Sequence, residues 1–318
     1  MKALSYEDVR AAAARIDGRV RRVPVVQTDV RDASPGARMF LALEFMQHTG
    51  TFKDRGAQNF IEAHREAGRL PTAGVAIASG GNAGLACAWS AAQQGIPATV
   101  FVPTTAPAVK VARLRAYGAR VEQVGTEYAQ AFDACRAFAE SSGALMSHAY
   151  DHPLIAAGAG TLVDEIRSQA PDLDTIVLAV GGGGLLAGVA TAASHHGIRT
   201  VAVEPTHCRS LNAAIEAGRP VDVSVRSVAA DALGARRVSD MAYLAARHPL
   251  VSSILVDDEA IVGARRQLWR DHRLAVEHGA ATAFAGVVDA AGYRPAPGER
   301  VCVVLCGANT DPRDVAEE

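Results

Sequence analysis

Residues 175–188 read TIVLAVGGGGLLAG, an apolar run that leads through four consecutive glycines into a second apolar segment. The run TIVLAV (175–180) is typical of a β-strand that is buried on both faces. The glycines predict a tight turn, and the residues from 185 to 196 predict a helix. A buried strand that turns directly into a helix is the building unit of a parallel sheet covered by helices. This stretch therefore indicates an α/β fold.

The same alternation of strand and helix continues outward along nearly the whole chain. We expect strands over 39–45, 74–79, 98–103, 120–124, 175–180, 200–204, 252–256 and 301–306. We expect helices over 5–17, 53–68, 83–94, 107–117, 126–140, 153–168, 185–196, 258–273 and 277–291, with a mostly helical region from about 208 to 248. Ser5, with Asp8 three residues later, predicts the cap of the first helix. Residues from about 311 are expected to form a short polar tail, and the whole pattern predicts parallel sheets flanked by helices.

Composition narrows the class of protein. The chain has 318 residues, a formal net charge of −2 and 49% hydrophobic residues, values that are ordinary for a globular protein. A near-neutral balance favours neither nucleic acid nor an anionic membrane as a partner. No run of about 18 uncharged apolar residues is present, and charged residues interrupt the N-terminal segment, so neither a spanning helix nor a secretory signal is expected. We therefore expect a cytoplasmic protein with no nucleic-acid or membrane partner.

The five cysteines lack CxxC spacing, so neither a disulfide framework nor a zinc site is indicated, and each is expected to be a small buried residue. Lysine is scarce. The 32 basic residues comprise 29 arginines and only three lysines, Lys2, Lys53 and Lys110. A Schiff base requires an amine, because the arginine guanidinium stays protonated. Covalent lysine catalysis in this chain therefore has three candidates, of which Lys2 lies in a terminal segment.

The glycine stretch 181–188 (GGGGLLAG) predicts an anion site. Four glycines let several backbone N–H groups approach a ligand, and the following helix adds the positive end of its dipole. Phosphate is the favoured ligand. A plain strand-to-helix turn is the alternative, and a dinucleotide site is a rival because Glu204 ends the next strand, although the spacing is not GxGxxG.

Two further loops bear on the chemistry. SGGNAG (79–84) again joins a strand to a helix, suits a carboxylate or phosphate, and carries Asn82 as a directional hydrogen-bonding group. QHTGTFKDRG (47–56) places Lys53 at a helix N-terminus, where the dipole disfavours an ammonium ion and so favours the neutral amine that imine formation needs. A phosphate-bearing aldehyde joined to Lys53, with an amino-acid carboxylate in the second loop, accounts for all three. Those are the features of pyridoxal phosphate chemistry.

Four motifs resemble those of the fold-type-II pyridoxal-phosphate enzymes, and they occur in the family's order. TGTFKDRGA (49–57) resembles the Schiff-base lysine motif, ASGGNAGLA (78–86) the substrate-carboxylate loop, GGGGLLAG (181–188) the phosphate loop, and LCGAN (305–309) the segment that faces the pyridine nitrogen. Within this family the chain is most similar to the serine/threonine dehydratases, also called ammonia-lyases, and to their serine dehydratase branch. The stretches that carry this finer resemblance are HCRSLNAAIEAG (207–218), SVAADALGA (227–235) and VEHGAATAFAGV (276–287).

The resemblance implies a two-domain fold like that of the tryptophan synthase β chain. The small domain would span 44–152, and the large, phosphate-binding domain would combine 1–43 with 153–318. Lys53 would be the catalytic base and the covalent anchor of the cofactor, and Asn82 would bind the cofactor's ring oxygen. The remaining cofactor-binding residues would be Phe52, Gly181, Gly182, Gly183, Gly184, Leu185, Ala232 and Cys306. The substrate carboxylate would lie among Thr51, Ser79, Gly80, Asn82 and Ala83.

Cys306 and two departures refine this expectation. A thiol facing the pyridine nitrogen leaves that nitrogen largely neutral, which favours elimination over reprotonation. Related serine racemases carry a serine at the position of Gly80, so we do not expect racemisation. Their divalent-cation site has an acidic residue where Ser210 stands. The dehydratase branch instead suggests a monovalent cation such as potassium, held by Glu204, Cys208, Leu233 and Ala235.

The function expected from the sequence is β-elimination of L-serine or L-threonine to a 2-oxo acid and ammonia, by a homodimer. A β-replacement synthase is one alternative, and a dehydratase of hydroxyaspartate or phenylserine is another. A non-catalytic protein that binds a phosphate ligand is a third, and the retention of Lys53, Asn82, the four glycines and Cys306 argues against it.

Overall fold

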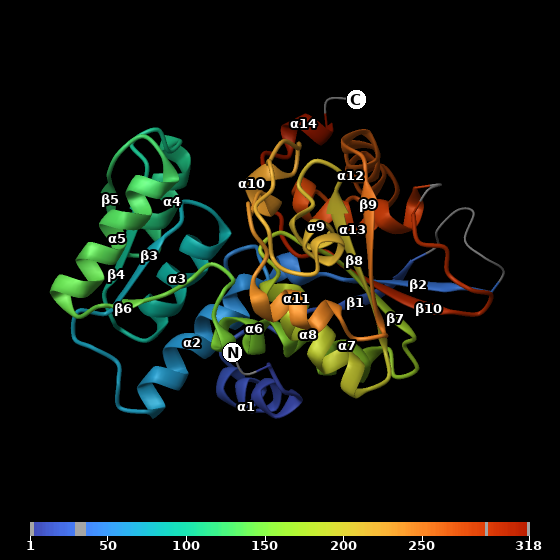
Figure 1. Cartoon of the computed structure of the whole chain (residues 1–318), viewed down its shortest axis with the longest axis horizontal. Coiled ribbons are helices and arrows are strands. Elements are labelled where there is room, and N and C mark those ends of the chain that lie inside the picture. Colours follow the sequence, from blue (N-terminus) through green and yellow to red (C-terminus); the bar gives the residue numbers. More distant parts are fainter. Residues whose placement is uncertain (1–2, 29–35, 290–291, 317–318) are drawn as a thin grey trace.

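The computed structural model describes residues 3–28, 36–289 and 292–316, and it folds into two lobes, each built on its own β-sheet (Figure 1). We call the part around the six-stranded sheet the large lobe and the part around the four-stranded sheet the small lobe. Helices flank both sheets, which confirms the α/β class expected from the sequence.

The six-stranded sheet has the order β1-β2-β10-β7-β8-β9. Its strands are β1 (Val25–Thr28), β2 (Arg38–Ala42), β7 (Thr175–Ala179), β8 (Arg199–Pro205), β9 (Val251–Val256) and β10 (Arg300–Val304). β1 pairs antiparallel with β2, and all other pairs are parallel. β7 lies between β10 and β8 and is buried at all five positions, as its uninterrupted apolar sequence predicts.

The four-stranded sheet is parallel throughout and has the order β5-β4-β3-β6. Its strands are β3 (Val75–Ala78), β4 (Ala98–Val102), β5 (Arg120–Gln123) and β6 (Leu145–Met146). Two separate apolar clusters cover its two faces, and a third, larger cluster surrounds the six-stranded sheet.

The helices are α1 (Tyr6–Ile16), α2 (Lys53–Glu66), α3 (Asn82–Gln93), α4 (Ala108–Ala116), α5 (Tyr128–Ser142), α6 (Pro153–Gly160), α7 (Leu162–Gln169), α8 (Gly184–His195), α9 (Ser210–Ala217), α10 (Ala230–Leu233), α11 (Asp240–Ala246), α12 (Asp258–His272), α13 (His278–Val288) and α14 (Arg313–Ala316), with a 3-10 turn η1 (Glu44–Met46). Helix α1 begins with the predicted cap: the Ser5 side chain accepts from the backbone of Asp8, and the Asp8 side chain accepts from the backbone of Ser5. In the described part of the chain, no helix is both long and apolar enough to span a membrane.

Several predicted elements need correction. The strand predicted over 39–45 ends at Ala42 and is followed by η1, and the short strands β1 and β6 were not predicted at all. The helix predicted over 153–168 divides at Thr161 into α6 and α7. The expected polar tail contains α14, and the helix predicted to reach 291 ends at Val288, residues 290–291 lying outside the described part. Short strands and helix ends depend on tertiary partners that local sequence does not reveal.

Helices α6 and α8 pack unusually closely, because glycines meet where they cross. A Cβ atom on Gly188 would lie 2.0 Å from the carbonyl oxygen of Ala156, and one on Gly160 would lie 2.6 Å from the carbonyl oxygen of Gly188. This contact fixes α8, and with it the glycine loop that begins the helix, against the helix that follows residue 152.

We predict that Gly188→Ala destabilises the protein by about 1–3 kcal/mol, because the added methyl group overlaps the α6 backbone. Gly263→Ala is the matched control. Gly263 also lies inside a helix, but its Cβ would meet nothing within 4 Å, so alanine should stabilise by about 0.5–1 kcal/mol. Urea unfolding of both variants measures the difference, and equal effects would contradict the close packing.

Candidate active site

The loop that carries Lys53 is joined through its backbone to the segment after β10. The N–H of Phe52 donates to the carbonyl of Cys306 (3.0 Å), and the N–H of Ala308 donates to the carbonyl of Gly50 (2.9 Å). Thr51 and Gly307 form an isolated antiparallel bridge between these bonds. Two segments that are about 250 residues apart in the sequence are therefore held side by side, with Lys53 at the first position of α2.

The polar partner of the Lys53 side chain is a carbonyl group rather than a carboxylate. Lys53 Nζ donates to the carbonyl of Ala149 (3.1 Å) and lies 4.7 Å from the centre of the Phe52 ring. No carboxylate of the described residues forms an ion pair with it. Burial lowers the pKa of Lys53 to about 8, an effect that nearby Cys306 and Glu277 partly oppose. A neutral amine is thus accessible near physiological pH, as nucleophilic or general-base lysines require.

The next residue, Asp54, fastens the first turn of α2. Its buried carboxylate accepts from the backbone N–H of Thr49 (2.9 Å) and from the Thr49 hydroxyl. Burial raises the pKa of Asp54 to about 7, against the effect of these two bonds.

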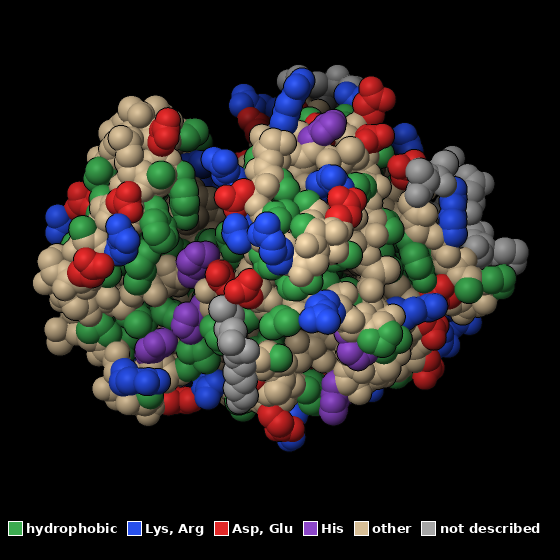
Figure 2. Space-filling model, in the orientation of Figure 1, with side chains coloured by type: hydrophobic (Ala, Val, Ile, Leu, Met, Phe, Trp, Pro, Cys, Tyr) green, Lys and Arg blue, Asp and Glu red, His purple; other side chains and the backbone are tan. Residues whose placement is uncertain are grey.

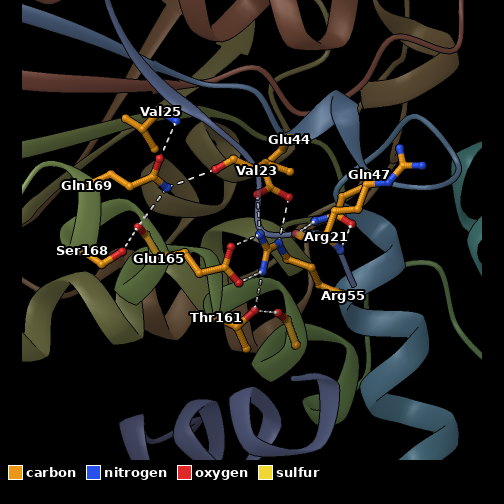
Figure 3. Close-up of polar contacts among 11 residues, drawn as sticks. Arg21, Val23, Val25, Glu44, Gln47, Arg55, Thr161, Glu165, Ser168 and Gln169 are labelled. Atoms are coloured by element: carbon orange, nitrogen blue, oxygen red, sulfur yellow. Dashed lines mark hydrogen bonds and ion pairs between the residues drawn. The ribbon is translucent and has the colours of Figure 1, made fainter. Parts of the chain in front are cut away.

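Arg55, which follows, is a fully buried charge whose guanidinium is surrounded by hydrogen-bond acceptors (Figure 3). Its guanidinium donates twice to Glu44 (2.7 and 2.9 Å), twice to Glu165 (2.6 and 2.7 Å) and once to the Thr161 hydroxyl (3.1 Å). These partners come from η1, α7 and the break between α6 and α7. The two carboxylates raise the pKa of Arg55, so the guanidinium is charged at every relevant pH. The network fixes where α2 begins.

The predicted anion loop follows β7. Gly183 has φ +90, a conformation that non-glycine residues rarely adopt, and a Cβ there would lie 2.3 Å from the Ala242 side chain. A Cβ on Gly181 would lie 2.9 Å from the Cα of Leu233, so the C-terminal end of α10 also packs against this loop. Within the described residues, the backbone N–H groups of 181–185 donate to no protein acceptor, and the first helical bond starts at Ala187 (2.8 Å to Gly183). A row of free N–H groups at a helix N-terminus is suited to a phosphate.

Tyr150 connects this loop to Lys53. Its ring lies on Gly182, where a Cβ would approach within 2.3 Å of the ring carbon Cγ, and its backbone lies beside Gly184. The preceding residue, Ala149, provides the carbonyl that Lys53 contacts. His148 Nδ1 accepts from the backbone N–H groups of Tyr150 (3.2 Å) and Asp151 (2.9 Å), which closes a turn here. The turn at Ala149 and Tyr150 thus contacts both Lys53, the candidate catalytic residue, and the glycine loop, the candidate phosphate site.

The third loop reaches the site from the small lobe. Residues 79–81 link β3 to α3, whose first residue is Asn82. Ser79 and Gly80 are half-buried and Ala83 is buried, while Thr51 on the facing loop is fully buried. Figure 2 shows the surface hollowed between the two lobes in the upper part of the view, with Lys and Arg side chains along the hollow.

Two residues that bring these loops together, Glu277 and Asn309, were not predicted from the sequence as site residues. The amide of Asn82 donates to Glu277 (2.9 and 3.1 Å) and accepts from Asn309 (2.7 Å), which also donates to the carbonyl of Thr49 (2.9 Å). Both residues lie in stretches that carry the family resemblance, 276–287 and 305–309. A signal for Glu277 was present: a lone carboxylate directly before an apolar helix.

The remaining candidates are placed as follows. The thiol of Cys306 is buried, and burial raises its pKa, so it is neutral. Lys110 lies on α4 and pairs with Asp231 (2.6 Å), and Lys2 lies outside the described residues. All five cysteines are buried free thiols.

Glu204, proposed from the resemblance as a cation ligand, holds the start of α9. Its oxygens accept from the backbone N–H groups of Leu211 and Asn212 (2.8 Å each), and burial raises its pKa to about 7. Ser210 donates to Glu204 (3.5 Å) and to the carbonyl of Gly181 (3.0 Å), the glycine that Leu233 contacts. Among the described residues, no group of three or more His, Cys, Asp or Glu side chains could hold a metal ion. This does not bear on a cation bound by carbonyl groups.

Comparison with known proteins agrees with this geometry. Residues 16–307 match the family model described as pyridoxal-phosphate dependent enzyme. The chain is 34% identical to an L-threonine ammonia-lyase from Geobacter sulfurreducens, over 98% of this chain and 77% of the relative. It is 35% identical to a phenylserine dehydratase from Ralstonia pickettii, over 94% and 91% of the two chains. The solved structure of maize serine racemase superposes with a TM-score of 0.92 at 30% identity, covering 99% and 97%.

We predict that Arg55→Ala lowers the free energy of unfolding by about 3–5 kcal/mol, because it leaves the buried carboxylate of Glu44 and the half-buried carboxylate of Glu165 without a counter-charge. Arg10→Ala is the control. Arg10 forms an exposed pair with Glu7 (3.2 Å), and its loss should change stability by no more than about 0.5 kcal/mol. Chemical denaturation at neutral pH measures both, and a loss in Arg55→Ala as small as in the control would refute the role of the network.

Proposed function

The chain belongs to the family of pyridoxal-phosphate dependent enzymes, and from this premise we propose that it eliminates the β-hydroxyl group of L-serine or L-threonine. The products are a 2-oxo acid and ammonia: the hydroxyl leaves as water, and one water hydrolyses the released enamine. The main support is the placement of Lys53. A lysine with a lowered pKa and a carbonyl as its polar partner lies where three glycine-containing loops meet.

The residues present fit the cofactor. We assign its phosphate to the N–H groups of Gly181, Gly182, Gly183, Gly184 and Leu185, which have no protein acceptor among the described residues. We assign Lys53 as its covalent anchor, Asn82 to its ring oxygen, Cys306 to its ring nitrogen, and Phe52 and Ala232 to its two faces. Bound pyridoxal phosphate supplies an electron-withdrawing ring that stabilises negative charge at the Cα atom of an attached amino acid.

The protein's own groups perform the remaining tasks. Thr51, Ser79, Gly80, Asn82 and Ala83 surround the substrate carboxylate in this proposal, where the N-terminus of α3 favours an anion. Lys53, as a neutral amine, takes the Cα proton and holds it on Nζ.

Cys306 favours elimination over other outcomes. A neutral thiol is a weak hydrogen-bonding partner, so it does not hold the ring nitrogen protonated as a carboxylate would. With the cofactor bound, negative charge at Cα would be less dispersed into the ring, and loss of the β-hydroxyl would compete well with return of the proton. This electronic argument supports a lyase.

The same site suits several β-hydroxy amino acids. Relatives named L-threo-3-hydroxyaspartate ammonia-lyase and phenylserine dehydratase share 32% and 35% identity with the chain, so these substrates are the second candidates. They differ from serine only beyond Cβ, and the proposed carboxylate loop and Lys53 serve all of them alike. A β-replacement reaction would need a better leaving group and a second nucleophile.

Further proposals extend the resemblance. We propose a homodimer in the cytoplasm and a small domain over 44–152, with 1–43 and 153–318 as the large domain. We also propose a monovalent cation, such as potassium, at Glu204, Cys208, Leu233 and Ala235. Glu204 retains lone pairs beyond the two backbone bonds that it accepts, so the cation does not conflict with its contacts.

We predict that the purified protein acquires a visible absorption band with pyridoxal phosphate and converts serine or threonine to pyruvate or 2-oxobutyrate. Lys53→Ala should lose the band and lower kcat by at least about 100-fold, because it removes both the anchor and the base. Lys110→Arg is the control and should behave as the parent. The panel should include hydroxyaspartate and phenylserine. A band without turnover would move the search to replacement reactions, and no band would refute the assignment.

We further predict that the parent forms no D-serine. Gly80 has no side chain to deliver a proton to the opposite face of Cα, and a positioned acid or base contributes about 10²–10⁴-fold. In Gly80→Ser, the new Cβ would lie 3.3 Å from Val102, a contact that small shifts can relieve, and slow D-serine formation should appear. Chiral chromatography of product mixtures measures this, and D-serine from the parent would overturn the prediction.

A further inference from the structure

Asn82 is held on two sides before any ligand arrives. Its nitrogen donates to both oxygens of Glu277 (2.9 and 3.1 Å), and its oxygen accepts from Asn309 (2.7 Å). An amide nitrogen carries two hydrogens, so Asn82 can keep one bond to Glu277 while giving the other to a ligand oxygen. The orientation of Asn82 is therefore decided by residues of the large lobe.

Contacts with Gly307 fix the position of Glu277. Its backbone N–H donates to the carbonyl of Gly307 (3.1 Å), and a Cβ on Gly307 would lie only 2.4 Å from the Glu277 Oε1 atom. Glycine at 307 thus leaves room for this carboxylate beside Cys306. Burial raises the pKa of Glu277 above its usual value, and the hydrogen bonds from the Asn82 side chain and the Asn309 backbone partly oppose this effect.

A buried arginine, Arg265, forms hydrogen bonds next to both partners of Asn82. Arg265 donates to the carbonyl of Val276 (2.7 Å), directly before Glu277, and to the hydroxyl of Thr310 (3.1 Å), directly after Asn309. It also forms a bidentate pair with Asp314 of α14 (2.7 and 2.8 Å). Because its side chain is nearly inaccessible to solvent, this support is rigid.

Lys53 and Glu277 affect each other's ionisation. Glu277 raises the pKa of Lys53, and Lys53 lowers that of Glu277, so each stabilises the charged form of the other. Of the other titratable groups, Cys306 acts on Lys53 and Asp231 acts on Glu277, while Lys53 lowers the pKa of His148. Burial raises the pKa of the Cys306 thiol and lowers the pKa of His148, so both groups favour their neutral forms. Neither group therefore provides a negative charge for Lys53 in place of Glu277.

We propose that Glu277 is a positioning residue of the active site, which holds Asn82 toward the cofactor and serves as the counter-charge of Lys53. This inference rests on the proposed function and adds a residue to it. Glu277 touches neither reacting atom. It acts through the Asn82 amide, by hydrogen bonding, and through Lys53, by charge.

Two substitutions separate these two actions. Glu277→Gln keeps the size of the side chain and removes its charge, so Lys53 should lose its proton at lower pH. Glu277→Asp keeps the charge and shortens the side chain, so the contact with Asn82 should be lost while Lys53 titrates nearly as in the parent. Glu259→Gln is the matched control, because Glu259 is an exposed residue of α12.

The first readout is independent of the cofactor. The full-length protein without pyridoxal phosphate is reacted with an amine-acylating reagent over a range of pH, and labelling of Lys53 is quantified by mass spectrometry. We expect a midpoint near 8 in the parent and in Glu259→Gln, and a midpoint lower by about one pH unit in Glu277→Gln. An unchanged midpoint in Glu277→Gln would overturn the role of Glu277 as counter-charge.

The second readout is the dissociation constant of pyridoxal phosphate, measured by equilibrium dialysis. Loss of one oriented hydrogen bond weakens binding by about 5–10-fold, and we expect this in Glu277→Asp and not in the control. Glu277→Gln keeps an oxygen that can accept from Asn82 and should bind the cofactor nearly as the parent does. Far-UV circular dichroism identifies a variant that has not folded, and Glu277→Ala, which also removes the contact, then decides in place of Glu277→Asp. Parent-like affinity in a folded variant that lacks the contact would overturn the positioning role. If the parent itself binds no cofactor, the proposed function fails, while the labelling midpoint still tests the charge pairing.

Discussion

The position of the catalytic lysine depends on one buried cation, Arg55. Arg55 lies two residues after Lys53, and its guanidinium must be neutralised because an unpaired charge in the interior is very unfavourable. Glu44 and Glu165 approach it in bidentate fashion from different elements. Together with the Thr161 hydroxyl, these carboxylates bond all three guanidinium nitrogens. The start of α2, and hence the origin of the Lys53 side chain, is therefore set by electrostatics that local helix propensity does not supply.

Around this anchor, backbone contacts assemble the chemistry. The bridge between Thr51 and Gly307 brings the lysine loop to Cys306, and the turn at Ala149 and Tyr150 brings it to the glycine loop. Two helix N-termini, those of α3 and α8, converge here and favour anions, while burial and the N-terminus of α2 disfavour the ammonium form of Lys53. One arrangement of helix dipoles thus suits both a phosphate and a neutral amine.

Much of this could be predicted from the sequence, and the failures share a cause. The uninterrupted run before the glycines predicted β7 correctly, and the cap at Ser5 was correct, because each depends on its own residues. The division of α6 from α7 was missed because it involves the Thr161 hydroxyl, which donates to the carbonyl of Gly158 and accepts from the remote Arg55. α14 was missed because its Asp314 is held by Arg265, 49 residues away in the sequence. Glu277 was missed because its partners, Asn82 and the Gly307–Asn309 segment, are remote in the chain.

The sequence by itself determined the α/β class, the order of the motifs and the residue types available for chemistry, since periodicity and glycine placement act over a few residues. It also singled out Lys53, because lysine is so scarce here. Only the tertiary structure decided which loops meet, which side chains are neutral, and that Asn82 faces Glu277. Those outcomes arise from burial and from hydrogen bonds between distant segments. Their free energies depend on the surroundings that the whole fold creates.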